Sequence, residues 1–214
     1  MVVIDLEAPD LDGAIARAGN VPLPPYFHGT LDDPDRYQTM FARSTGSAAA
    51  PTAGLHFTPE VAEGLRQREI TIASVDLHVG IDTFRPIAAE ELEDHVMHSE
   101  WCSIPETTAA AIAGARANGG RVVAIGTTVV RALESFADDA GTVRAGEGET
   151  DLFLLPGVEF RVVDALVTNF HVPASTLVVL VAAFMGDRWR EAYQTALQRG
   201  YRFLSFGDAM LAER

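Results

Sequence analysis

The chain has 214 residues, of which 48% are hydrophobic, and this composition suits one domain with a buried core rather than a disordered chain. No apolar run approaches the roughly 20 residues that a membrane helix requires, and the N-terminus lacks the basic and then apolar start of a signal peptide. The single cysteine, Cys102, excludes an intramolecular disulfide and a zinc cage built from several cysteines. We therefore expect a cytoplasmic protein.

Acidic residues outnumber basic residues by 30 to 16, which gives a formal net charge of −14 at pH 7. This charge argues against indiscriminate binding along nucleic acids, whose phosphates are also negative. All 16 basic residues are arginines, so each cation is a planar guanidinium suited to phosphate or carboxylate groups. A local basic patch is compatible with this composition, and four arginines make the C-terminal part locally basic: Arg188, Arg190, Arg199 and Arg202.

Residues 1–35 are expected to form a strand, a helix and a proline-rich connector. The strand covers residues 2–6, and the helix covers residues 10–18, with Asp10 as its N-cap and Gly19 as its stop. Prolines then favour an extended path up to residue 35.

Residues 36–214 alternate between helical and strand patterns and are expected to form one α/β domain. The expected helices span residues 59–68, 105–118, 127–137, 176–184 and 188–200. The expected strands span residues 70–79, 99–104, 121–125, 152–155, 160–163 and 166–168, with a hairpin or loop over 139–149 and a helical turn after 203–206. Because the strands are apolar throughout, the pattern predicts a mainly parallel or mixed sheet flanked by helices.

The clearest candidate for a binding site is a glycine turn between a strand and a helix. Gly126 permits a tight turn, while Thr127 and Thr128 place hydroxyls beside free N–H groups at a helix start. Ligands bind at the carboxyl ends of parallel strands, so this turn is suited to a ribose, a carboxylate or a phosphate. An ordinary turn capped by threonine is an equally good interpretation of the pattern alone.

Histidines occur in loops and at the ends of the expected elements, where functional side chains collect. His56 lies in a loop of small residues, His78 lies near the end of an expected strand, and His98 and Glu100 lie at the start of another. His171 follows the last apolar strand. Imidazole acts as an acid or a base near neutral pH, although each histidine taken singly is more often a structural residue.

Two arginines and an asparagine complete the candidates. Arg85, in D-T-F-R-P, and Arg131, one turn into the helix after Gly126, are placed to hold an anion, and Asn169 lies close to His171. The alternative for each arginine is an ion pair that contributes little. His95 and His98 form an H-x-x-H pair, but no ligand set is compelling, so we expect no metal.

Long and unusual strings of residues run through nearly the whole chain. They are P-L-P-P-Y (22–26), R-Y-Q-T (36–39), G-S-A-A-A-P-T-A-G-L-H-F-T (46–58), L-H-V-G (77–80), T-F-R-P (83–86), H-V-M-H-S-E-W (95–101), A-I-G-T-T-V-V-R-A-L-E-S (124–135), T-D-L-F (150–153), V-V-D-A-L-V-T-N-F-H-V-P-A-S-T-L (162–177) and Y-R-F-L-S-F-G-D-A-M-L (201–211). In order and spacing these strings resemble the S-adenosylmethionine:tRNA ribosyltransferase-isomerase family of queuosine biosynthesis.

The resemblance implies a reaction. S-adenosylmethionine would donate its ribosyl group to a 7-aminomethyl-7-deazaguanine base in the anticodon loop of tRNA. Adenine and methionine would leave, and epoxyqueuosine would remain on the tRNA, with no metal or redox cofactor. Family members are longer, and the part that would precede Met1 includes an inserted β-barrel and the start of the large domain. This chain would correspond to the later part of that domain.

The resemblance also suggests roles. Four residues are the candidates for proton transfer: His56, His78, His98 and Glu100. Gly126, Thr127 and Thr128 would hold the ribose or the methionine carboxylate, Arg85 and Arg131 would face that carboxylate or a tRNA phosphate, and Asn169 and His171 would line the same crevice. Four aromatic residues are possible stacking surfaces for tRNA bases: Phe57, Phe84, Trp101 and Phe170. One departure, Asp82 beside T-F-R-P, stands where a glycine is usual.

Three alternatives stay open. A truncated or reduced paralogue would bind a nucleoside without turnover. A metal-dependent hydrolase would use His95, His98 and a further histidine. An exposed sheet edge would also allow the chain to pair with another copy of itself.

Overall fold

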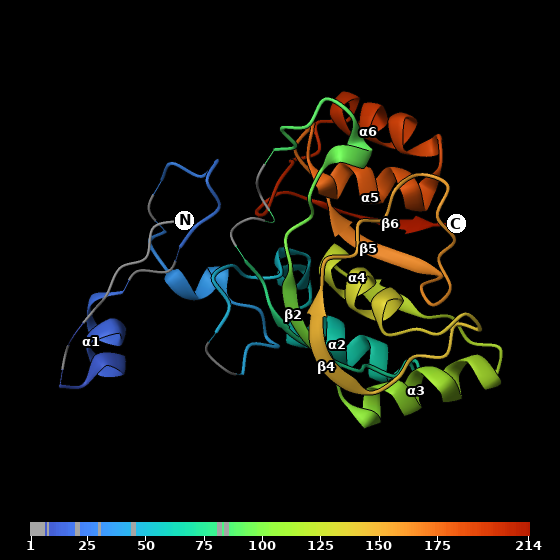
Figure 1. Ribbon diagram of the computed structural model, residues 1–214, viewed down its shortest axis with the longest axis horizontal. Coiled ribbons are helices and arrows are strands. Elements are labelled where there is room, and N and C mark those ends of the chain that lie inside the picture. The colour runs from blue at the N-terminus through green and yellow to red at the C-terminus, as the bar shows by residue number, and fades with distance from the viewer. Residues whose placement is uncertain are drawn as a thin grey trace.

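The central helix α4 (Thr127–Ser135) packs against strands from two small sheets, as the ribbon in Figure 1 shows. The computed structural model describes residues 7, 9–19, 22–29, 31–43, 46–80, 83 and 86–214. The other helices of eight or more residues in this part of the chain are α1 (Leu11–Ala18), α2 (Pro59–Arg66), α3 (Glu106–Ala117), α5 (Thr176–Met185) and α6 (Arg188–Gln198).

Each sheet has three strands. One is antiparallel, in the order β1 (Asp76–His78), β2 (Glu100–Ile104), β4 (Gly146–Thr150). The other has the order β3 (Val123–Ile125), β5 (Ala165–Asn169), β6 (Ala209–Glu213), with β3 parallel to β5 and β6 antiparallel to β5.

The α/β class and the mixed pairing are confirmed, but mainly parallel pairing is wrong for the described strands. Among them, only β3 and β5 run parallel. The crossover from β3 to β5 contains α4 and also β4 of the other sheet, and it returns the chain in the parallel sense. Between β5 and β6 the chain forms two helices, α5 and α6, which contact each other, and the second helix reverses the direction once more.

Three helices begin at a residue whose side chain caps the first turn. Asp10 accepts a hydrogen bond from the N–H of Gly13 at 2.9 Å and caps α1, as expected. Thr58 caps α2, which has a proline in its first turn, and Ser175 caps α5 through the N–H of Val178. A hydroxyl or carboxylate at this position satisfies an N–H group that the helix leaves free.

Several expected elements differ. Residues 152–155 and 160–163 form no strand, residues 70–75 lie outside β1, and residues 2–6 lie outside the described residues. The carboxylate of Glu134, on α4, accepts the N–H groups of residues 161–163 at 2.8 to 3.1 Å, so this segment binds a side chain instead of a neighbouring strand.

Two segments near expected loops or turns form strands. The glycine-rich stretch expected as a hairpin or loop contributes β4, which pairs along all of β2. The last segment pairs with β5 as β6 instead of forming a helical turn. In both segments the side chains show no clear strand pattern, and backbone hydrogen bonds to a neighbouring strand stabilise the extended structure.

The main core lies between α4, α5 and the mixed sheet. Val130, Leu133, Leu166 and Leu180 are buried in it, and it extends to Ile104 on β2. A smaller cluster around Phe170 and Tyr193 joins α5 to α6. These two clusters fix the start of α4 against the end of β5. In Figure 1, α1 lies apart from both sheets.

Candidate functional site

The start of α4 lies directly after β3, at the carboxyl end of the parallel strand pair. Gly126 precedes the helix with a φ of 97°, a conformation that favours glycine, and its N–H donates to the Val167 carbonyl at 2.8 Å. Thr127 and Thr128 are buried at the first two helical positions, and no side chain caps this helix. The first N–H groups of α4 are therefore available to a ligand.

The end of β5 lies beside this turn. Ile125 pairs with Val167, so the residues that follow each strand emerge side by side. Asn169 is the last residue of β5, and His171 lies two residues beyond it; both are buried. Candidates that are more than 40 positions apart in the sequence thus meet at one sheet edge.

These residues line a common cavity, which we name the central hollow. Of the candidates, Gly126, Thr127, Thr128, Asn169 and His171 line it. Further polar side chains in its wall come from other parts of the chain: Tyr26, Thr52, Thr83, Thr168, Ser175 and Ser205. The described wall contains hydroxyls, an amide and one imidazole but no Asp, Glu, Lys or Arg. Such a lining suits ribose hydroxyls and the edge of a nucleobase.

Asn169 lines the central hollow and hydrogen bonds to His56, which does not itself line the hollow. The Asn169 carbonyl oxygen accepts from the Thr52 hydroxyl at 3.2 Å, and its amide nitrogen lies 3.3 Å from the Leu204 carbonyl, which can only accept. The same amide nitrogen therefore donates to His56 Nε2 at 2.9 Å, and the neutral ring carries its proton on Nδ1. Burial lowers the pKa of His56, which favours this neutral form.

His171 is a neutral group of the wall. Burial lowers its pKa to about 4, and its Nε2 lies 2.8 Å from the Thr168 hydroxyl. Its backbone N–H donates to the Tyr193 hydroxyl at 3.0 Å. His171 thus lines the hollow without adding a charge to it.

A second cavity, which we name the side hollow, adjoins the first and shares Thr83, Thr127 and Thr128 with it. His98 and Arg131 line the side hollow together with apolar side chains such as Leu180. The two hollows therefore meet at the start of α4.

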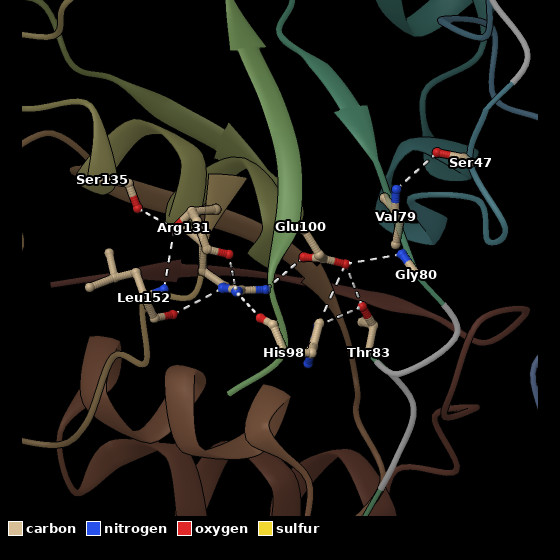
Figure 2. A network of polar contacts seen from close by, with 10 residues as sticks. Ser47, Val79, Gly80, Thr83, His98, Glu100, Arg131, Ser135 and Leu152 are labelled. Atoms are coloured by element: carbon tan, nitrogen blue, oxygen red, sulfur yellow. Dashed lines mark hydrogen bonds and ion pairs between the residues drawn. The ribbon is translucent and has the colours of Figure 1, made fainter. Parts of the chain in front are cut away.

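Arg131 and Glu100 form the ion pair beside the side hollow. Arg131 Nη1 lies 2.6 Å from Glu100 Oε2, and the remaining guanidinium nitrogens donate to the carbonyls of His98, Thr150 and Leu152 at 3.0 to 3.1 Å (Figure 2). Every nitrogen of this guanidinium is thus occupied within the fold. This geometry anchors α4 to β2, and a substrate anion would have to compete with these acceptors.

The Glu100 carboxylate is also fully engaged. Its Oε1 accepts from the Thr83 hydroxyl at 2.7 Å and from the Gly80 N–H at 3.3 Å, and His98 Nε2 lies 3.6 Å away. Burial raises the pKa of Glu100, but the hydrogen bonds from His98 and Thr83 and the charge of Arg131 outweigh burial and hold it below its ordinary value. Glu100 is therefore ionised and acts as an acceptor.

Two candidates lie elsewhere. His78 is exposed on β1, packs on the ring of Trp101 with centroids 4.5 Å apart, and lines neither hollow. Arg85 lies outside the described residues, as do Asp82 and Phe84.

Sequence reasoning missed several wall residues. Thr83 lies in the T-F-R-P string, but it lacks the ionisable group that draws attention to Arg85. Tyr26 and Ser205 hydrogen bond to each other across 179 positions, a relationship that no local pattern reveals. The matching strings P-L-P-P-Y and F-L-S-F-G were the available signal.

Neither membrane nor metal sites emerge from the described part of the chain. No described helix is long and apolar enough to cross a membrane. No three His, Cys, Asp or Glu side chains gather there as a metal site. His95 packs edge-on against Phe153, whereas His98 faces Thr83 and Glu100, so the geometry offers no support for the hydrolase alternative.

The chain is similar in sequence to curated proteins of other organisms. An S-adenosylmethionine:tRNA ribosyltransferase-isomerase from Sorangium cellulosum is 55% identical over 219 residues, covering 99% of this chain and 59% of that protein. The corresponding protein of Moorella thermoacetica is 54% identical over 201 residues, covering 94% of this chain and 59% of that protein. The chain thus spans about three fifths of the length of these curated relatives.

A solved structure and a family model extend the match. The crystal structure of an S-adenosylmethionine tRNA ribosyltransferase from Thermotoga maritima superposes with a TM-score of 0.60 at 46% identity, covering 74% of this chain and 50% of that one. The family model described as "Queuosine biosynthesis protein" matches residues 1–212. These matches confirm the resemblance seen in the sequence, and the chain belongs to the family of queuosine biosynthesis proteins.

Proposed function

We propose that this chain binds S-adenosylmethionine in the central hollow and transfers and isomerises its ribosyl group onto a 7-aminomethyl-7-deazaguanine base in the anticodon loop of tRNA. Adenine and methionine are the products that leave, and epoxyqueuosine-tRNA remains. The observation that carries the proposal is the convergence of Gly126, Thr127, Thr128, Asn169 and His171 on one uncharged hollow in a member of this family.

The hollow suits the donor chemically. Threonine hydroxyls and the free N–H groups of α4 are hydrogen-bond partners for ribose hydroxyls or for the methionine carboxylate. The neutral wall, with His171 uncharged, adds no repulsion against the positive sulfonium. Asn169 and His171 line the hollow, His56 is hydrogen bonded to Asn169, and these side chains are candidates for assisting the departure of adenine.

The central experiment measures adenine released when the chain is incubated with precursor tRNA and S-adenosylmethionine. We expect adenine and modified tRNA in equal amounts. Thr127→Ala and His98→Ala should each lower turnover more than about tenfold, or about 1.4 kcal/mol of transition-state stabilisation. Thr107→Val, an exposed position of α3, is the matched control and should keep the wild-type rate. We expect the same loss for Arg85→Ala.

A second candidate function is nucleoside binding without turnover, and the length of the match favours it. Because the chain spans 59% of its curated relatives, the hollow can retain nucleoside binding while groups required for turnover lie in the remaining part of those proteins. Calorimetry with S-adenosylmethionine separates the two cases. Binding without adenine release, beside an active full-length relative, would support this function over the first.

A further inference from the structure

Thr83 connects the ion pair to a histidine. Its side chain is buried, and it lines both the central hollow and the side hollow. Its Oγ1 lies 2.7 Å from Glu100 Oε1 and 3.3 Å from His98 Nε2 (Figure 2). The hydroxyl therefore bridges a carboxylate and an imidazole.

The number of protons on Glu100, Thr83 and His98 determines which group donates in each hydrogen bond of this bridge. Glu100 is ionised beside Arg131, so its carboxylate can only accept. The single hydroxyl proton of Thr83 therefore points to Glu100, and only oxygen lone pairs remain toward His98. His98 Nε2 must then donate to Thr83, which requires the ring proton on Nε2.

The other ring nitrogen is left as an acceptor. A neutral imidazole with its proton on Nε2 carries a free lone pair on Nδ1. Within the described part of the chain, Nδ1 of His98 has no hydrogen-bond partner. His98 lines the side hollow, which meets the central hollow at Thr127 and Thr128.

We propose that Thr83 is a positioning residue that, together with Glu100, holds the ring proton of His98 on Nε2 and leaves Nδ1 as the base for the reaction. The inference deepens the proposed function and rests on it for the identity of the substrate. It separates the roles of two candidates, because Glu100 orients His98 and does not itself take the proton.

The proton balance of this step is simple. The bond between the acidic hydrogen and its substrate atom breaks, the electron pair stays on that atom, and a new N–H bond forms at His98 Nδ1. The resulting imidazolium donates through Nε2 to Thr83, whose hydroxyl remains hydrogen bonded to the Glu100 carboxylate. The Glu100 carboxylate lies 3.6 Å from Nε2 of the same ring.

Nitrogen-15 NMR of the histidine rings tests the inference without any substrate. Long-range spectra of the neutral imidazoles show which nitrogen of each ring carries the proton, and His98→Gln identifies the His98 signals. We expect the proton on Nε2 in the wild type and in Thr83→Ser, and a mixture of both tautomers in Thr83→Val. A proton on Nδ1 of His98 in the wild type overturns the proposal.

Adenine release provides the second readout. Thr83→Val should lower the rate about tenfold, while Thr83→Ser, which keeps the hydroxyl, retains most of the rate. Thr107→Val is again the control. A wild-type rate in Thr83→Val would contradict the positioning role. If the wild-type chain releases no adenine, the proposed function fails for this chain, and the tautomer measurement still decides the role of Thr83.

Discussion

Arg131 and Glu100 face each other across 2.6 Å with side chains that are 4% and 1% exposed, so the ion pair that joins α4 to β2 is almost completely shielded from water. Removing one partner of a buried pair leaves an uncompensated charge. Arg131→Met should therefore lower the free energy of unfolding by about 3–5 kcal/mol, as measured by urea denaturation.

The double variant Arg131→Met with Glu100→Leu is the matched test of that explanation. It removes both charges and should recover part of the loss, because no buried charge then stays unpaired. A single variant within 1 kcal/mol of the wild type, or a double variant worse than the sum of the two singles, would show that the pair is not what holds α4 to β2.

His171 makes stability depend on pH. Its folded-state pKa is about 4, below the ordinary value of 6.5, so the unfolded chain binds a proton first as the pH falls. The resulting stabilisation is complete above about pH 6.5 and is lost progressively down to about pH 4; it amounts to about 3 kcal/mol. The difference in unfolding free energy between the wild type and His171→Gln should shift by this amount across that range. If the difference in unfolding free energy does not change with pH, the His171 ring is exposed to water and not buried.

The turn before α4 depends on glycine. Gly126 has φ 97° and ψ 148°, a region that side-chain-bearing residues rarely occupy, while the nearest atom to an added Cβ is 3.6 Å away. Backbone strain and not a clash should therefore dominate, and Gly126→Ala should lose about 1–3 kcal/mol. Gly114→Ala, in the exposed part of α3 with open space around it, should instead gain about 0.5–1 kcal/mol. Thermal unfolding of both variants checks the contrast.

The sequence predicted elements well where local side chains determine them. Asp10 caps α1 as expected, and α2 and α5 begin at residues 59 and 176 as expected, capped by Thr58 and Ser175. The glycine turn at Gly126 was also predicted, because a tight turn between a strand and a helix has its own pattern.

The sequence was a poor predictor of structure where a segment is stabilised by partners far away in the chain. β4 is rich in glycine and glutamate and has no strand pattern, yet β2 pairs with it along its whole length. The meeting of Gly126, Thr127 and Thr128 with Asn169 and His171 followed from parallel strand ends. The engagement of Arg131 by Glu100 and three carbonyls did not, since those acceptors come from other segments of the chain.

Glu134 is predicted to hold the chain segment before β5. Its carboxylate accepts three consecutive backbone N–H groups, from residues 161 to 163. Val162 and Val163 are buried, so their N–H groups would otherwise lack a partner. Glu134→Ala should cost about 2–3 kcal/mol of unfolding free energy. Glu147→Ala, on the exposed side of β4, is the control and should stay within about 0.5 kcal/mol of the wild type. Equal effects of the two substitutions would contradict the role given to Glu134.

Replacing the amide nitrogen of Asn169 by oxygen should destabilise the fold. Its amide nitrogen donates to the Leu204 carbonyl and to His56, so Asn169→Asp places a carboxylate oxygen against an acceptor in a buried site. We expect a loss of about 2–3 kcal/mol at neutral pH, since an unsatisfied and charged group replaces a donor. Burial should raise the pKa of the new carboxyl, so protonation on acidification should restore part of the stability relative to the wild type. Denaturation curves of both proteins across the acidic range measure this recovery, and a loss that grows as the pH falls would show that the amide nitrogen does not face Leu204.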